Sequence, residues 1–232
     1  MLCFRRPVYV GLAISSINSL HYFNPRHRVT LYLDAVCLQE FGRQKSRLDY
    51  KDYVRGVLIE DDPAAPWQLT KLRLVLLSAS QGIPFVDADS RWHLDPAPLL
   101  DPDCVTYLVE VNRLRNVPAE CALVERGLGR PEWKDLRHYN TGFVSIPGKY
   151  CSEEFKGECH SLARQILDFS LTEGVRAEEG RLLRHVCEEL ALSLAAQIAI
   201  GPDNIRTLKA EDGPGNRRVI ESFYYGALHG IT

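Results

Sequence analysis

Apolar residues recur at helical spacing near the start of the chain and then form a β-branched run. Over 8–20 they follow a period of 3.6 residues, which predicts a helix. The run 29–33, VTLYL, is β-branched and aromatic and is typical of a buried strand that ends at Asp34. A further strand is expected over 53–59. This order of elements predicts an α/β protein.

The middle of the chain brings acidic residues to the end of an expected strand. Leucines at helical spacing predict a helix over 67–80, and Gly82 follows where a C-cap glycine belongs. The next strand is expected at 83–86, and Asp87 and Asp89 come directly after it. Ligands of open α/β sheets bind at the carboxyl ends of strands, so these carboxylates are suitably placed for a site.

The second half of the chain predicts two strands and two long helices. The strands are expected at 105–111 and 142–146, with a glycine-containing loop between them. The helices are expected near 152–171 and 177–200. The second helix has a stripe of apolar residues, namely Leu182, Val186, Leu190 and Leu194. Since neither a repeat nor a linker is found, we expect one domain over 1–232.

The composition excludes nucleic acid as a primary partner. The chain is 45% hydrophobic and 25% charged, which is ordinary for a globular domain. Its 28 Lys and Arg are balanced by 30 Asp and Glu, so it has no broad basic surface to attract phosphate backbones.

The cysteines and the hydropathy favour a cytoplasmic protein. The seven cysteines form an odd set without a CxxC pair, and we expect them to be free thiols. No apolar run approaches the roughly 20 residues that span a bilayer, and the first residues lack the apolar region of a secretory signal.

The triplet Asp87-Ala88-Asp89 is the main candidate for chemistry. Two carboxylates one residue apart can direct oxygen ligands at one hard cation, Mn²⁺ or Mg²⁺. Such a cation offsets the charge that develops on a diphosphate when a sugar-phosphate bond breaks. Taken alone, the triplet is also compatible with a solvated turn.

Three blocks in the same order resemble the GT-A glycosyltransferases, in particular the glycogenin-like ones. The segment 70–90, which contains FVDADS, resembles the family's metal motif and the stretch before it. The segment 139–147, YNTGFVSIP, resembles the strand that lines the sugar pocket, and 13–34 resembles the first helix and second strand. The resemblance implies a GT-A-like α/β fold, with a mixed, mostly parallel sheet flanked by helices. Only residues 1–7 precede the first helix, so we expect at most a stub of the family's first strand and a domain without a full one.

The resemblance also implies roles for individual residues. Asp89 would be a metal ligand, and Asp87 would be shared between the metal and the ribose. Lys71 would lie near the donor's phosphates or sugar hydroxyls, unless it is a surface lysine on an amphipathic helix. Asn140 would hydrogen-bond the donor sugar or the acceptor, unless it only satisfies backbone groups of a turn.

Two further candidates lie later in the chain. Glu189 would act as a base on the acceptor or stabilise positive charge on the sugar ring. For Glu188 the favoured interpretation is a helix-surface residue. The family ends with a metal-binding His followed by a diphosphate-binding Lys, and here Phe223 and His229 align with that pair. His229 therefore either reaches the metal or the phosphate, or has no role.

The leading hypothesis is a metal-dependent glycosyltransferase, hexosyltransferase-like and retaining by analogy with glycogenin. It would move a sugar from a nucleotide-diphosphate donor to a glycan, protein or small-molecule acceptor, and a homo-oligomer is compatible with the sequence. One alternative is a non-catalytic sugar-nucleotide-binding or interaction protein of the same fold. A nucleotidyltransferase ranks lower, because no glycine-rich phosphate loop followed by Arg and Lys is found near the N-terminus.

Overall fold

The computed structural model describes residues 1–60, 65–208 and 220–222. The chain divides into two compact units. The first comprises 1–64, 85–100 and 208–232, and the second comprises 65–84 and 101–207. Helices alternate with strands, which confirms the predicted α/β class.

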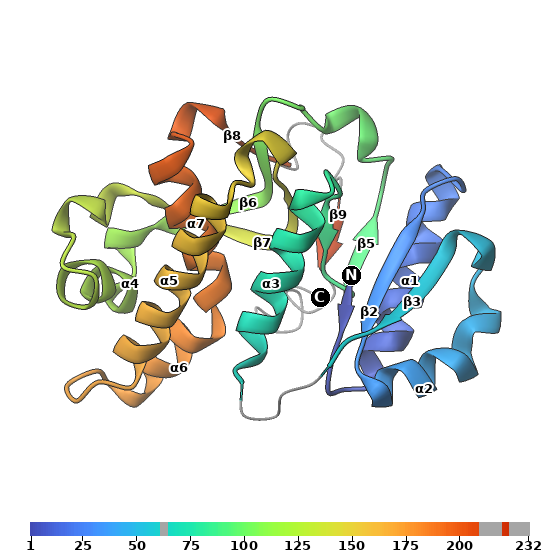
Figure 1. Ribbon diagram of the computed structural model, residues 1–232, viewed down its shortest axis with the longest axis horizontal. Coiled ribbons are helices and arrows are strands. Elements are labelled where there is room, and N and C mark those ends of the chain that lie inside the picture. The colour runs from blue at the N-terminus through green and yellow to red at the C-terminus, as the bar shows by residue number, and fades with distance from the viewer. Residues whose placement is uncertain (61–64, 209–219, 223–232) are drawn as a thin grey trace. The chain divides into compact units, whose positions relative to one another are not determined.

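The first unit contains a parallel sheet with the strand order β1-β2-β3. The helices that connect these strands, α1 and α2, pack against the sheet and against each other (Figure 1). In β2, Leu31 and Leu33 have no exposed surface, as the VTLYL pattern predicts. These elements span Leu2–Cys3 (β1), Val8–Phe23 (α1), Val29–Leu33 (β2), Ala35–Gln44 (α2) and Val54–Leu58 (β3).

Asp34 joins two connections in this unit. Its Oδ1 accepts the backbone N–H of Cys37 at 2.8 Å and so caps the amino end of α2. Its Oδ2 accepts the backbone N–H of Arg5, a residue in the left-handed region with φ of 58°. One carboxylate thus starts a helix and holds the loop between β1 and α1.

Short elements complete the first unit. After β4 the chain forms β5, which pairs antiparallel with β9. The bounds are Lys45–Arg47 (η1), Lys51–Tyr53 (η2), Phe85–Val86 (β4), Ser90–Trp92 (β5), Ala97–Leu99 (η3) and Ile220–Ser222 (β9), where η marks short 3₁₀ or π turns.

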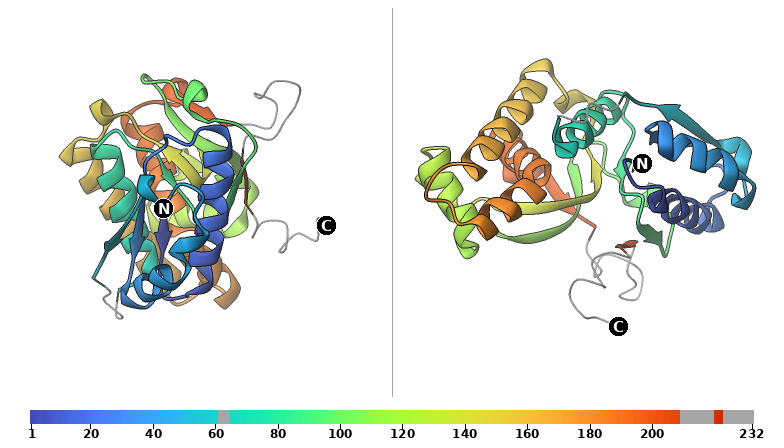
Figure 2. Two further views of the ribbon diagram at one scale, coloured as in Figure 1. Left: turned by 90° about the vertical axis from the view of Figure 1, so that its right-hand side faces the viewer. Right: turned by 90° about the horizontal axis from the view of Figure 1, so that it is seen from below.

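The second unit is built on a mixed sheet. The long strands β6 and β7 run antiparallel, and β8 pairs with β6 in the parallel direction. Figure 2 shows β6 (green) and β7 (yellow-green) as two curved strands side by side. The strands span Val105–Arg113 (β6), Arg137–Ser145 (β7) and Ile205–Thr207 (β8).

Helices cover this sheet. The helix α7 packs on β7, and α3 and α5 pack on α7 (Figures 1 and 2). The helices are Trp67–Ser80 (α3), Pro118–Ala122 (α4), Glu153–Ser170 (α5), Ala177–His185 (α6) and Cys187–Ala199 (α7). The short turns are Leu114–Asn116 (η4), Leu123–Gly127 (η5), Pro131–Asp135 (η6), Gly148–Tyr150 (η7) and Pro202–Asn204 (η8).

The end of α3 confirms one prediction and shortens another. Gly82 has φ of 65° and donates its N–H to Ala79, while Ile83 donates to Ser78, which is the Schellman pattern of a helix end. Ile83 therefore belongs to the helix cap. The strand expected from residue 83 begins at Phe85.

Three other boundaries differ from the prediction. The strand expected at 142–146 begins at Arg137, because its first half is polar and lacks an apolar signal. The helix expected over 177–200 is interrupted at Val186 and forms α6 and α7. The region expected to be a glycine-containing loop folds largely as α4 and a π turn.

Two further expectations concern the cysteines and the hydropathy of the helices. All seven cysteines are free thiols, as predicted, and six are buried. Across the described part of the chain, no helix combines the length and apolarity needed to cross a bilayer.

Gly180 is the position where α6 approaches α5 most critically. A Cβ there would collide with the backbone carbonyl oxygen of Ser170, which cannot move without shifting α5. We expect Gly180→Ala to lower the free energy of unfolding by about 1–3 kcal/mol in urea titrations. The control is Gly157→Ala in α5, where a Cβ meets no atom within 4 Å. It should raise stability by roughly 0.5–1 kcal/mol, and equal effects of the two changes would contradict the packing.

Candidate functional site

The helix α7 is attached to β7 by a polar stripe. Ser193 accepts the backbone N–H of Tyr139 at 2.9 Å, and Gln197 accepts that of Arg137 at 2.9 Å. Gln197 also donates to the carbonyl of Arg137 at 2.7 Å. Glu189, Ser193 and Gln197 are four residues apart and share one side of the helix. The stripe therefore places Glu189 beside the following residues of β7.

Glu189 receives hydrogen bonds from three side chains of β7. Its Oε1 accepts from Asn140 Nδ2 at 3.1 Å and from the Thr141 hydroxyl at 3.5 Å. Its Oε2 lies 3.2 Å from Nε2 of His138. Both carboxylate oxygens are thus held by the strand.

An irregularity in β7 makes this arrangement possible. Tyr107 of β6 pairs with Val144, but Val109 already pairs with Asn140, so β7 carries extra residues between these pairs. Asn140 Oδ1 accepts the backbone N–H of Gly142 at 2.8 Å within this bulge. Bulges redirect side chains, and here the amide of Asn140 both closes the bulge and donates to Glu189.

His138 connects Glu189 to a second carboxylate. Its Nδ1 lies 2.9 Å from Oε1 of Glu120 in α4. Burial lowers the pKa of His138, but hydrogen bonds to Glu120 and Glu189 outweigh that effect and raise its pKa to about 9. The imidazole is therefore a cation at neutral pH, with one carboxylate on each nitrogen.

A buried ion pair lies next to this group. Nζ of Lys71 in α3 is 3.2 Å from Oε1 of Glu188. Burial raises the pKa of Glu189, but the hydrogen bond from His138 and the charge of Lys71 together lower it below its ordinary value. We call Lys71, Glu120, His138, Glu188 and Glu189 the charged network.

Glu189 is the member of the charged network that reaches solvent. Its side chain is 14% exposed, whereas those of the other four are between 2% and 6% exposed. A ligand approaching the network would meet Glu189 first.

The structure brings together two of the predicted site residues, Asn140 and Glu189, through a direct hydrogen bond. The structure also contradicts the interpretation of Lys71 and Glu188 as surface residues. Lys71 is buried and ion-paired, so it is not a surface lysine, and Glu188 is buried, so it is not a helix-surface residue. The donor contact expected of Lys71 stays a prediction.

His138 and Glu120 are site residues that the sequence analysis missed. His138 lies two residues before Asn140, and alternate residues of a strand share a face, so its position was a usable signal. Glu120 had no comparable signal, because it lies in a five-residue helix 18 positions before its partner.

Asp87 and Asp89 belong to the first unit, where they follow β4 directly. Both are half-buried, and they flank the buried Ala88 in the turn before β5. Within the described residues, no three His, Cys, Asp or Glu side chains gather as a metal site. The metal-binding role of Asp87 and Asp89 stays a prediction, which rests on the preference of Mg²⁺ and Mn²⁺ for carboxylate oxygens completed by water and substrate phosphates. His229, the third predicted ligand, lies outside the described residues.

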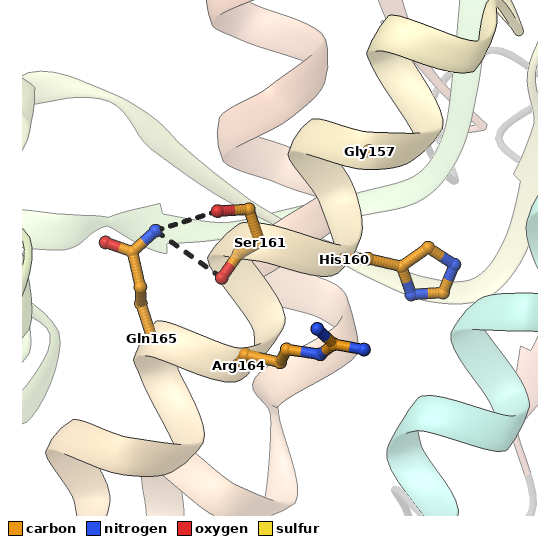
Figure 3. Close-up of a pocket in the computed structure, with 5 residues that line it drawn as sticks. All are labelled: Gly157, His160, Ser161, Arg164 and Gln165. Atoms are coloured by element: carbon orange, nitrogen blue, oxygen red, sulfur yellow. Dashed lines mark hydrogen bonds between the residues drawn. The ribbon is translucent and has the colours of Figure 1, made fainter.

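A surface depression of about 500 Å³ lies along α5 (Figure 3), and the described residues that line it include none of those predicted for the site. It is lined by Gly157, His160, Ser161, Arg164 and Gln165. Burial and the neighbouring charges of Arg164 and Arg73 lower the pKa of His160. Among the described residues, neither a carboxylate nor a member of the charged network lines this depression.

Crystal structures of two glycosyltransferases are similar to this chain. An active-site mutant of LgtC matches with a TM-score of 0.54 and 11% identity, covering 90% of this chain and 72% of LgtC. The galactosyltransferase LgtC with donor and acceptor sugar analogs matches with 0.51 and 10%, covering 90% and 73%. Mouse xyloside xylosyltransferase 1 in its apo form matches with 0.52 and 12%, covering 90% and 84%. No family model and no curated protein sequence matches the chain.

These similarities establish the class of fold. At 10–12% identity they concern architecture alone. The chain has a GT-A-like glycosyltransferase fold, with a parallel sheet flanked by helices, as the resemblance of its three sequence blocks implies.

His138 should make stability depend on pH. Its pKa of about 9 lies above the ordinary value of 6.5, so its contribution is fully present below pH 6.5 and is lost as the pH rises through 9. We expect the free energy of unfolding to fall over this range by up to about 3 kcal/mol. Urea titrations at several pH values measure it. His138→Gln should lose this dependence and His185→Gln, which changes an exposed histidine, should keep it; the same pH dependence in all three proteins would contradict the assignment.

Proposed function

We propose that this protein transfers a sugar from a nucleotide-diphosphate donor to an acceptor hydroxyl, and that Glu189 faces the sugar ring. The observation that carries the proposal is the charged network, whose solvent-reaching member is a carboxylate held by Asn140, Thr141 and His138. The GT-A-like fold supports it, because the solved proteins that share this fold include sugar transferases.

The net charge of the network suits this chemistry. Counted formally, three carboxylates face two cations, which leaves one negative charge in excess. When the bond between the anomeric carbon and the diphosphate breaks, the leaving oxygen takes the electron pair and the sugar ring becomes positive. A fixed anion that faces the ring stabilises that positive charge at little reorganisation cost.

The lowered pKa of Glu189 favours charge stabilisation over proton abstraction by this residue. A general base works best when its pKa lies near the working pH. The pKa of Glu189 is lowered by His138 and Lys71, so its carboxylate is a weak base at neutral pH. The proton of the acceptor hydroxyl therefore leaves by another route, for which an oxygen of the departing diphosphate is suited.

In this proposal Asp87 and Asp89 hold Mn²⁺ or Mg²⁺, and His229 is the candidate third ligand. The cation, when bound, offsets the negative charge that develops on the diphosphate. Asp87 also contacts the ribose. Lys71 acts indirectly, because its charge lowers the pKa of Glu189 and so favours the carboxylate that faces the sugar ring. By analogy with glycogenin-like enzymes, we propose a hexosyl donor, retention at the anomeric carbon, and a glycan, protein or small-molecule acceptor.

Replacing Glu189 by Gln keeps the shape of the side chain and removes its charge. We expect kcat for transfer or donor hydrolysis to fall about 10²–10³-fold, with KM for the donor changed only a few-fold, because the lost interaction acts mainly in the transition state. The assay is a panel of nucleotide sugars with Mn²⁺, read by mass spectrometry. The exposed Glu132→Gln should behave as wild type. Activity of Glu189→Gln within twofold of wild type would reject this role.

Replacing Asp89 by Ala tests the metal site separately. We expect loss of Mn²⁺-dependent donor binding in calorimetry, and loss of Mn²⁺-stimulated turnover, because one of two carboxylate ligands is gone. The exposed Asp168→Ala is the matched control and should bind as wild type. Unchanged metal dependence in Asp89→Ala would overturn the site. Donor binding by wild type without any turnover would favour the non-catalytic alternative.

A further inference from the structure

His138 lies between two carboxylates that come from different helices. Its Nδ1 is 2.9 Å from Glu120 in α4, and its Nε2 is 3.2 Å from Glu189 in α7. The side chains of His138 and Glu120 are each 3% exposed, so the contact between these two residues is shielded from water.

With both carboxylates ionised, only a protonated imidazole can donate a hydrogen bond to each of them. The imidazolium donates from both nitrogens, whereas the neutral ring donates from one and presents a lone pair at the other. Loss of the proton would therefore leave one carboxylate facing a lone pair in a buried site. The charged groups that act on His138 are Glu120 from α4 and Glu189 from α7. Lys71 from α3 acts on Glu189 and so affects His138 indirectly.

Burial of the Glu120 carboxylate costs folding free energy, so stability alone does not explain this residue. Its Oε2 is buried and has no hydrogen-bond partner among the described residues, so its side chain interacts chiefly with His138. Buried ionic groups are often replaceable by apolar side chains of similar volume without loss of stability. The arrangement is better explained by what it does to Glu189.

We propose that His138 and Glu120 are positioning residues for Glu189: Glu120 keeps His138 charged and oriented, and His138 holds the Glu189 carboxylate as an anion in one orientation. This inference rests on the sugar-transfer function proposed above. While His138 fixes Oε2, Asn140 and Thr141 fix Oε1, so the carboxylate cannot rotate. Activity should then fall on the alkaline side as His138 loses its proton.

The test changes Glu120, because this residue is hydrogen-bonded to His138 and takes no part in the hydrogen bonds that Asn140 and Thr141 donate to Glu189. In Glu120→Gln, removal of the charge should lower the pKa of His138 by about 1–2 units. The alkaline limb of the kcat profile should move down by the same amount, so that kcat at pH 8.5 falls about tenfold relative to wild type. Glu120→Asp, which keeps the charge, should restore part of the shift, and the exposed Glu132→Gln should leave the profile in place.

An NMR titration provides a second readout that needs no turnover. With ¹³C-labelled histidine, and the His138 signal assigned from its absence in His138→Gln, wild type should keep this ring protonated to about pH 9. Both Glu120→Gln and Glu189→Gln should titrate at lower pH. This experiment also decides the matter if Glu120→Gln folds poorly, because wild type and Glu189→Gln are then compared directly.

The outcomes separate the two proposals. If His138 of wild type titrates near 6.5, or if Glu120→Gln lowers kcat equally at every pH, the positioning role is wrong and the protein can still be a glycosyltransferase. If wild type processes no nucleotide sugar while His138 shows the expected coupling to both glutamates, the proposed function fails and the linked carboxylates stand. If the pKa of His138 and the alkaline limb move together, the positioning role is supported.

Discussion

The contact between α7 and the polar half of β7 is the interaction on which the second unit depends. Backbone groups that are removed from water must find partners, and at Arg137 and Tyr139 those partners are Gln197 and Ser193 of α7. The helix therefore has one position and one rotation that satisfy the strand. The same rotation brings Glu189 to Asn140, so the architecture and the candidate site have a common physical origin.

Electrostatics inside this unit follow from the way burial is compensated. Isolated charges are costly in a protein interior, but each buried charge here has an opposite charge within 3.2 Å. Glu189 gains most, because His138 and Lys71 both favour its ionised form. The cluster thus resembles the fixed dipoles and charges that enzymes arrange before a reaction begins.

Residue patterns predicted correctly those elements whose signal lies within one segment of the chain. The apolar run of β2, the helix α5 and the glycine cap after α3 depend on neighbours in the chain, and the structure confirms all three. The early residues of β7 were missed because their partners lie about 50 to 60 positions later. The division between α6 and α7 was missed because Val186 fits a helical stripe by spacing alone.

The candidate site shows the same division. Asn140 and Glu189 were identified through a family resemblance, and the structure joins them. The burial of Lys71 and the role of Glu120 depend on tertiary contacts, which spacing along one chain does not contain.

The spacing of Glu189, Ser193 and Gln197 limits how this helix can change. Successive residues of an α-helix are rotated by about 100°, so inserting or deleting one residue between Glu189 and Ser193 would turn the carboxylate away from β7 while the rest of the stripe stayed attached. Length variation should be tolerated much better before α7, where the chain already bends at Val186. The four-residue spacing within α7 must therefore stay fixed, whereas insertions and deletions at the interruption before α7 leave this spacing unchanged.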